Sequence, residues 1–322
     1  MKDFTGRLAV ITGGGTGMGR ELARQLVAEG CSVAMCDVSA TNMAQTRALC
    51  EDGAPQGVRV TTHLADVSDE AAVLRFAAEV GELQETERIN LLFNNAGIGG
   101  GGSFVSGGRA EWDKTFGVCW GGVYNCTRAF MPMLMAATEG YIVNTSSVNG
   151  FWASLGPSIP HTAYSAAKFA VKGFTEALIT DLALNAPHIK VSLVMPGHIG
   201  TSIVSNSRMV LSGEESYQIS AGAIAQSRAR MTAAGTDTQA LTDAQIAATL
   251  EDRARRFLED APTTAAHAAT VILDGVRNET WRILVGDDAH ELDVRVRADP
   301  AAAYDAPFFA DYAKAVGWRV GG

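Results

Sequence analysis

The chain has 322 residues, a formal net charge of −9 and 47% hydrophobic residues, values typical of a globular protein with a sizeable buried core. The negative charge and the absence of any Lys/Arg cluster argue against nucleic-acid binding, and no apolar run reaches the length of a membrane span. The first residues lack the apolar stretch of a secretory signal, the five cysteines show no ligand spacing, and the six histidines form no metal-binding pattern. We therefore expect a cytoplasmic protein with reduced thiols and no metal.

The first predicted element is a buried strand at residues 7–12, which leads into a glycine-rich turn. The turn reads Gly13-Gly14-Gly15-Thr16-Gly17-Met18-Gly19, and a helical pattern follows it. Glycines let the backbone approach a pyrophosphate, and the start of a helix presents unpaired N–H groups and its positive end. The sequence therefore predicts a dinucleotide-binding turn.

The next predicted strand, residues 32–36, ends at Asp37, twenty positions beyond Gly17. An acid at this spacing accepts hydrogen bonds from an adenosine ribose and repels a 2′-phosphate. Neither Thr16 nor Val38 supplies a compensating cation, so this region favours NAD over NADP. The alternative is that Asp37 is only an acid at a helix N-terminus.

The alternation of strands and helices continues, and each strand ends in a short polar or glycine-containing turn. We expect strands at 58–64, 89–93 and 141–145, a helix at 69–80, and turns at Asp66-Val67, Asn94-Asn95-Ala96-Gly97 and Ser146-Ser147. Such alternation implies an α/β fold with a doubly wound parallel sheet of the Rossmann type. Ligands bind such sheets at the carboxyl ends of the strands, where all these turns lie.

A long helix is expected around Tyr164 and Lys168, which lie one turn apart on the same helical face. Ionising a phenol at neutral pH requires about 3 pKa units, or about 4 kcal/mol, of stabilisation, and a neighbouring ammonium supplies part of it. Taken alone, this spacing is also that of an ordinary solvated pair.

Together these motifs resemble the short-chain dehydrogenase/reductase family, over residues 5–201 and again near residues 262–286. The resemblance rests on Thr12-Gly13-x-x-x-Gly17-x-Gly19, Asn94-Asn95-Ala96-Gly97, Ser146-Ser147, Tyr164-x-x-x-Lys168 and Pro196-Gly197, in this order. It implies a single Rossmann-fold domain over residues 1–322 that holds both cofactor and chemistry. It also implies a homo-oligomer, commonly a homotetramer, with a homodimer as the other expected assembly.

The resemblance implies a role for each matching residue. Tyr164 would be the acid/base, Lys168 would lower its pKa and hold the nicotinamide ribose, and Ser147 would position the substrate oxygen. The cofactor would contact Gly13, Thr16, Gly17, Met18 and Gly19 at the pyrophosphate, Asp37 and Val38 at the adenosine ribose, Asp66 and Val67 at the adenine, Asn95, Ala96 and Gly97 at the ribose, and Pro196, Gly197, Ile199 and Thr201 at the nicotinamide.

One residue departs from the family pattern. Cys119 stands where the family usually has an asparagine, whose main-chain carbonyl helps to hold a water linked to the lysine. A cysteine keeps the carbonyl but offers only a weak side-chain donor. Our hypothesis is that the proton relay survives; the alternatives are that Cys119 only packs or that it is a redox-sensing thiol.

The substrate side has a loop between Ser147 and Tyr164 that is about four residues longer than is usual in the family, with two prolines and two glycines that favour a rigid loop. Its aromatic residues, Phe151 and Trp152, could wall an apolar pocket with Trp120 or could pack under the loop. The candidate substrate contacts are Asn149, Trp152, His161 and Met209. For His161 and Met209 the alternatives are a hydrogen-bonded loop histidine and helix packing.

Residues 202–260 occupy the place of the family's substrate lid, and we expect helices at 213–234 and 242–260, the second opened by a capping box at Thr242. A helix starting at Pro262 and running through 263–276 and an edge strand at 281–285 follow. The extension at 287–322 carries Tyr304, Phe308, Phe309, Tyr312 and Trp318. It is too aromatic for a free tail, so we expect it to pack on the core or on a neighbouring subunit.

The sequence thus predicts an NAD-dependent oxidoreductase acting on a small molecule, a hydrophobic and in some cases aromatic secondary alcohol or its ketone. One alternative is a ketone reductase fed by NADH. Another is an NAD-binding regulatory module that has lost its chemistry, which only Cys119 supports.

Overall fold

The computed structural model describes residues 1–156, 159–213, 219–233 and 235–317. At its centre is a seven-stranded sheet in the order β3-β2-β1-β4-β5-β6-β9, in which all neighbouring strands are parallel. The strands are β1 (Leu8–Thr12), β2 (Ser32–Asp37), β3 (Val60–Leu64), β4 (Leu91–Asn94), β5 (Gly140–Thr145), β6 (Ile189–Pro196) and β9 (Arg282–Val285). The predicted doubly wound α/β fold is confirmed, and the last strand is an edge strand as expected.

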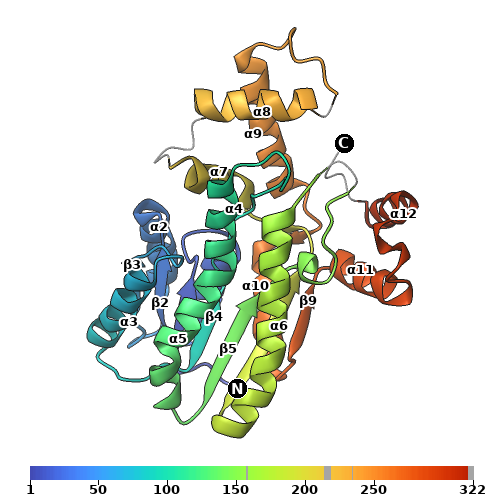
Figure 1. The fold of residues 1–322 in the computed structure, drawn as a ribbon. Coiled ribbons are helices and arrows are strands. Elements are labelled where there is room, and N and C mark those ends of the chain that lie inside the picture. Colours follow the sequence, from blue (N-terminus) through green and yellow to red (C-terminus); the bar gives the residue numbers. More distant parts are fainter. Residues whose placement is uncertain (157–158, 214–218, 234, 318–322) are drawn as a thin grey trace.

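Helices cover both faces of this sheet (Figure 1). One face carries α1 (Gly17–Ala28) and α10 (Ala265–Arg277), and the other carries α3 (Glu70–Gln84), α5 (Gly122–Met135) and α6 (Thr162–Asn185). The strands feed both layers because successive side chains point to opposite faces: Ala9 and Ile11 belong to the first core, and Leu8 and Val10 to the second. The central strands are therefore largely apolar, as the run Leu8–Thr12 indicates.

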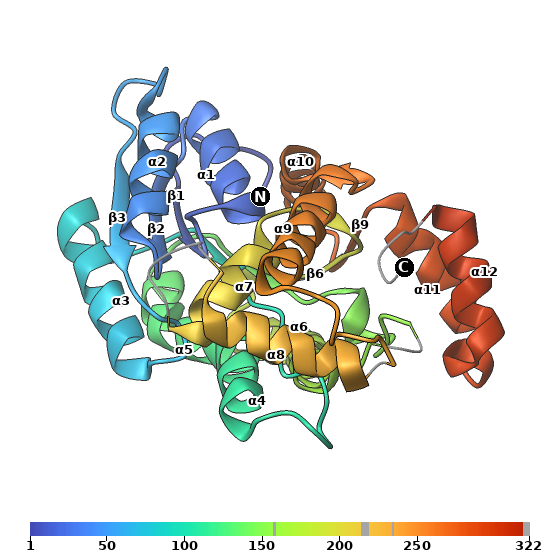
Figure 2. The same ribbon diagram turned by 90° about the horizontal axis from the view of Figure 1, so that it is seen from above.

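Helices α7 (Ile203–Ser212), α8 (Ala221–Ala233) and α9 (Asp243–Glu259) lie together beyond the carboxyl ends of the strands (Figures 1 and 2). Of the helix predicted at 213–234, the stretch Ala221–Ala233 is confirmed, Gly213 is not part of it, and residues 214–218 and 234 lie outside the described residues. Gly213, at φ 71°, instead ends α7 in a left-handed conformation, and the next described helix begins at Ala221. The predicted capping box is confirmed, because Thr242 and Gln245 satisfy each other's backbone N–H groups.

The helix expected from Pro262 through 263–276 is present as α10, but it begins later than predicted, at Ala265. Thr264 is its N-cap and accepts a hydrogen bond from the His267 amide. Thr263 and Thr264 form a short strand, β8, which pairs with β7 (Ile199–Gly200). The pairing ties the segment after β6 to the start of α10.

The C-terminal extension packs on the body of the protein through helices α11 (Asp287–Ala298) and α12 (Ala306–Val316), which lie beyond β9 (Figure 1). Trp152, only 1% exposed, lies against Phe308, Phe309 and Tyr312, and its Nε1 donates a 2.7 Å hydrogen bond to the carbonyl of Ala303. The extension therefore packs on the core, as predicted for its described part; Trp318 lies outside the described residues.

Candidate active site

The glycine-rich turn has the shape that a diphosphate needs. Gly13 and Gly17 have positive φ angles of 67° and 55°, and a Cβ on Gly19 would lie 2.1 Å from the Gly13 carbonyl oxygen. Helix α1 starts here with no side-chain cap from Thr16 and no acid in its first turn. Its N–H groups and positive end are thus left for an anion, so the residues present fit the diphosphate of a dinucleotide.

Asp37 closes the outer side of this turn. Its Oδ2 accepts from the Gly15 amide and its Oδ1 from the Ser39 amide, each at 3.0 Å. Burial raises the pKa of Asp37, while these amides and the nearby Arg20 guanidinium oppose the rise. The carboxylate is thereby held facing the turn.

Arg20, a residue that the sequence did not single out, holds the other side of Gly15. Its guanidinium donates to the Gly15 carbonyl at 2.6 Å and to Thr46 Oγ1 at 2.9 Å. Its position directly after Gly19 is the feature of the sequence that could have indicated a contact with the glycine-rich turn.

The Asn95 turn is fastened to the end of β1 by Thr12. Thr12 Oγ1 accepts from the amides of Asn95 and Ala96, both at 3.0 Å, and Asn95 Nδ2 donates to the Thr12 carbonyl at 3.1 Å. Asn95 Oδ1 is buried without a hydrogen-bond partner among the described residues. It is a free acceptor beside the glycine-rich turn, where a ribose hydroxyl fits.

Ser147, Tyr164 and Lys168 meet at the carboxyl end of β5. The Ser147 hydroxyl lies near the Tyr164 hydroxyl, close enough to lower the pKa of the phenol. Lys168 Nζ lies 5.4 Å from the centroid of the Tyr164 ring and donates to the Thr145 carbonyl at 2.8 Å. Ser146 Oγ donates to the Lys168 carbonyl at 2.8 Å and so joins α6 to the same strand end.

Burial is the strongest influence on the charges of these groups. It raises the pKa of Tyr164 far above its usual range, and the nearby Ser147 hydroxyl lowers it only in part. Burial also lowers the pKa of Lys168. In the protein alone the phenol is therefore neutral, and ionising it requires positive charge close to the ring.

Cys119 lies in a π-helical turn, Gly117–Gly121, between α4 (Arg109–Phe116) and α5. Its side chain is fully buried, and Sγ donates to the Ile98 carbonyl at 3.1 Å. A Cβ added to Gly97 would lie 3.6 Å from Lys168 Nζ and 3.8 Å from Cys119 Sγ. The thiol is thus close to the lysine and is hydrogen-bonded to the segment that follows the Asn95 turn.

The residues expected near the adenine are placed at the end of β3. Asp66 pairs with Lys114 and accepts hydrogen bonds from Ser68; burial alone would raise its pKa, but these contacts lower it. Val67 is buried, whereas Val38 is 45% exposed. Lys114 was not foreseen from the sequence, because it approaches Asp66 from α4, 48 residues away.

The segment after β6 approaches the glycine-rich turn from the opposite side. The Gly197 amide donates to the Val285 carbonyl at 2.9 Å, directly after Pro196. A Cβ on Gly17 would lie 3.1 Å from the methyl group of Thr201, so the two segments are in contact. Ile199 is 4% exposed between them.

Two of the candidate substrate contacts serve the loop after Ser147 instead. Asn149 Nδ2 donates to the carbonyls of Trp152 and Ser154, so both amide hydrogens are used within the loop. Trp152 faces the C-terminal extension, and its expected place in a substrate pocket is wrong because α12 completes its apolar surroundings.

His161 lies beside Tyr164, with ring centroids 4.6 Å apart. Burial, aided by the charge of Arg253, lowers the pKa of His161 to about 4. It also lines a cavity of about 610 Å³ together with Ser154, Ser165 and Phe169. Tyr164 is not part of that lining, so this cavity lies beside the tyrosine rather than over it.

Helix α7 contacts both the glycine-rich turn and the segment after the Asn95 turn. Asn206 Nδ2 donates to Thr16 Oγ1 at 2.8 Å, and Ser207 Oγ accepts from the Gly99 amide at 2.8 Å. Met209, half-buried on the same helix, remains a candidate substrate contact. The sequence could not reveal these contacts because they join segments more than 100 residues apart.

The described residues form neither a metal site nor a membrane-spanning helix. Across the described part of the chain, no group of three His, Cys, Asp or Glu side chains is arranged to hold a metal ion. None of the described helices combines the length and the apolar character needed to cross a bilayer.

Comparison with known proteins adds a family match. Residues 7–210 match the short chain dehydrogenase family model. The SadH protein of Mycobacterium tuberculosis is 33% identical over 318 residues, 99% of each chain, and the levodione reductase of Leifsonia aquatica is 35% identical over 66% of this chain and 76% of its own. A short-chain dehydrogenase/reductase from Burkholderia phymatum, crystallised with NAD, superposes with a TM-score of 0.72 at 28% identity, covering 93% of this chain and 95% of its own.

Proposed function

The chain belongs to the short-chain dehydrogenase/reductase family of oxidoreductases, and from this premise we propose that it interconverts a hydrophobic secondary alcohol and its ketone with NAD as cofactor. The observation that carries the proposal is the meeting of Ser147, Tyr164 and Lys168 beside the glycine-rich turn. An acid/base phenol, an oxygen-positioning hydroxyl and a cation at one strand end suit proton transfer to or from a carbinol oxygen.

The roles follow from these positions. Ser147 holds the substrate oxygen, and Tyr164 takes the hydroxyl proton in oxidation or returns it to the ketone oxygen in reduction. Lys168 places positive charge near the ring, which opposes the effect of burial on the phenol. The bound nicotinamide supplies the hydride chemistry. Helix α7 covers the turns and limits the access of water.

The preference for NAD rests on Asp37. Its carboxylate is fixed by the amides of Gly15 and Ser39 at the turn, and Val38 beside it is neutral. A 2′-phosphate placed there would meet a negative charge in a partly buried setting, whereas ribose hydroxyls would find an acceptor. Arg20, the nearest cation, is already engaged with Gly15 and Thr46.

The proposed substrate class rests on the apolar side chains around the site. Val210 and Leu211 of α7 and Trp120 pack against the second core, as Tyr164 does. The similarity to a levodione reductase is consistent with a ketone as one partner of the reaction.

The direction of the reaction and the assembly are separate proposals. A reductase fed by NADH uses the same residues with the proton and hydride reversed. We also propose a single domain with residues 202–260 as its substrate lid, a homotetramer or homodimer, and a cytoplasmic location. Sedimentation of the purified chain tests the assembly.

The test of the enzyme is a screen of steroid, terpene, aryl and acyl alcohols, and of the matching ketones, with NAD(H) and NADP(H) in parallel. We expect turnover with at least one class and a preference for NAD(H). Binding of NADH without turnover across the panel would instead favour the regulatory module. A preference for NADP(H) would contradict the role of Asp37.

A further inference from the structure

The segment after β6, residues 197–201, is hydrogen-bonded to the side chain of Asp288 in the first turn of α11. This contact lies outside the proposed cofactor site. Asp288 Oδ2 accepts a 2.6 Å hydrogen bond from the His198 amide, and the residue is only 2% exposed. Ninety residues separate the two partners in the chain. The contact thus joins the C-terminal extension to the segment that precedes Ile199 and Thr201.

The carboxylate fits between two glycines. A Cβ on Gly197 would lie 2.3 Å from each oxygen of Asp288, and a Cβ on Gly286 would lie 2.4 Å from Oδ1. Gly286 also has a φ of 98°, which other residues rarely adopt. Only residues without a side chain therefore fit at positions 197 and 286, on either side of the Asp288 carboxyl group.

This arrangement is costly for the fold. Asp288 Oδ1 is buried with no hydrogen-bond partner among the described residues, and burial raises the pKa of the carboxyl group. A buried acceptor left unsatisfied destabilises the folded state, so its presence needs an explanation beyond packing. The backbone at Asp288 is held by α12, because the Tyr312 hydroxyl donates to the Asp288 main-chain carbonyl at 3.2 Å.

Residues 197–201 lie between the proposed lid and the glycine-rich turn. His198 Nε2 is 2.8 Å from the carbonyl of Phe257 at the end of α9, and Ile199 pairs with Thr263. On the other side, Thr201 contacts Gly17. Asp288 is therefore one of the supports that set the position of residues 197–201 relative to the proposed pyrophosphate site.

We propose that Asp288 is a positioning residue that acts through the His198 amide to hold residues 197–201 against the nicotinamide half of the cofactor. The C-terminal extension is then part of the cofactor site, although none of its residues needs to touch the dinucleotide. This role rests on the proposed function, because it presumes that residues 197–201 meet the nicotinamide.

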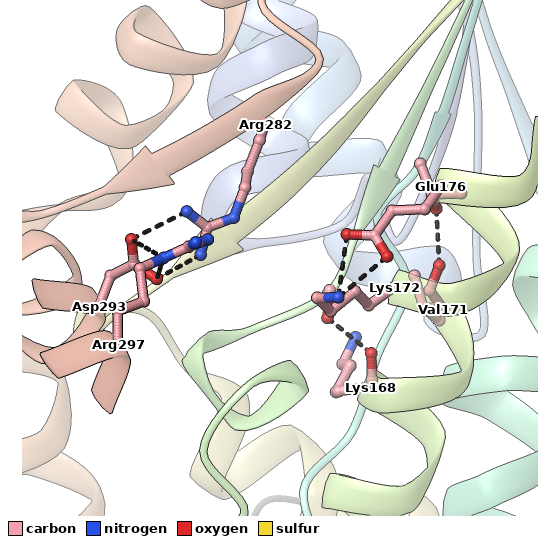
Figure 3. A network of polar contacts seen from close by, with 9 residues as sticks. Lys168, Val171, Lys172, Glu176, Arg282, Asp293 and Arg297 are labelled. Atoms are coloured by element: carbon pink, nitrogen blue, oxygen red, sulfur yellow. Dashed lines mark hydrogen bonds and ion pairs between the residues drawn. The ribbon is translucent and has the colours of Figure 1, made fainter. Parts of the chain in front are cut away.

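The test separates the two halves of the cofactor. NADH and ADP-ribose, which lacks the nicotinamide, are titrated into the wild-type chain and into Asp288→Leu, Asp288→Asn and Asp293→Asn. Asp293 is the matched control because it lies on the same helix but pairs with Arg282 and Arg297 rather than with the His198 amide (Figure 3). Thermal unfolding of each variant checks that it is folded, and Asp288→Ser, too short to reach the amide, replaces the leucine variant if that does not fold.

For Asp288→Leu we expect NADH to bind about tenfold more weakly, as for the loss of one buried hydrogen bond, while ADP-ribose binds within about twofold of wild type. Asp288→Asn keeps an acceptor for the His198 amide and should restore NADH binding to within about threefold. Asp293→Asn should leave both affinities unchanged.

Equal weakening of NADH and ADP-ribose, or the same loss in Asp293→Asn, would mean that α11 acts only by general stability and would overturn the role. Unchanged NADH binding in a folded Asp288→Leu chain would also overturn it. If the wild-type chain bound neither compound, the proposed function itself would fail, which is a different result from a selective loss in the variants.

Discussion

Lys168 Nζ lies 5.4 Å from the centroid of the Tyr164 ring, and both residues are held at the end of the central sheet. The lysine is 2% exposed and donates to the carbonyl of Thr145 at the end of β5. Burial acts against both charges, since it raises the pKa of the phenol and lowers that of the amine. The pair is therefore not a solvated surface pair. Shifted pKa values of this kind are typical of groups that exchange a proton.

Replacing Tyr164 with phenylalanine removes only the proposed proton carrier. We expect kcat/KM to fall by about 10²- to 10⁴-fold, the usual contribution of general acid–base catalysis, while NADH binding changes little. Steady-state rates and NADH titration measure the two effects. Tyr124→Phe, at a 47% exposed tyrosine, is the control. Near-normal turnover by Tyr164→Phe would remove the mechanism.

Replacing Asp37 with serine, together with Val38→Arg, should shift cofactor preference from NAD towards NADP. The change removes the negative charge facing the turn and adds a cation beside it. We expect the ratio of kcat/KM values for the two cofactors to move by at least about tenfold, or about 1.4 kcal/mol. Asp52→Ser, at an exposed aspartate, should leave the ratio unchanged.

Cys119→Asn restores the residue type that the family resemblance leads one to expect. Because the Cys119 carbonyl is part of the main chain in either case, we predict a change in kcat of less than about tenfold. The buried thiol bonded to Ile98 must be replaced by a larger amide, so stability is measured beside activity. A hundredfold gain in kcat would show that the cysteine had broken the proton relay.

Trp152 should be central to the docking of the C-terminal extension. Trp152→Ala is expected to lower the free energy of unfolding by about 3–5 kcal/mol, because it empties a fully buried site and removes the bond to Ala303. Urea denaturation measures the change. Trp281→Ala, at a tryptophan that is 45% exposed, should cost clearly less. Similar losses in both variants would argue against this packing.

Protonation of His161 should lower the free energy of unfolding in mild acid. The pKa of His161 is lowered to about 4 by burial and by Arg253, whereas an unfolded histidine titrates near 6.5, so the unfolded state binds more protons between these values. Stability is therefore lost as the pH falls through this window, by about 1–2 kcal/mol between pH 7 and pH 5 for a half-buried group.

His161→Gln should remove this part of the pH dependence, whereas His267→Gln, at an exposed histidine, should not. Urea denaturation of the three proteins at pH 7 and pH 5 provides the comparison. If wild type and His161→Gln lost the same free energy of unfolding between the two pH values, His161 would not be the group that titrates.

The features that can be predicted from the sequence are those determined by a short stretch of neighbouring residues. The order of apolar strands, the glycines after β1, the acid after β2 and the four-residue spacing of Tyr164 and Lys168 each follow from a short stretch of chain. The α/β architecture, the capping box at Thr242 and the packing of the aromatic extension were predictable for this reason.

Only the tertiary structure decided which side chains meet across long separations. It turned Trp152 towards α12 rather than towards substrate, paired Lys114 with Asp66, and brought Asp288 to the His198 amide. Burial also decided that the dominant effect on Tyr164 is a raised pKa. Periodicity and local propensity encode the elements, but desolvation and hydrogen bonding depend on neighbours that the fold brings from distant parts of the chain.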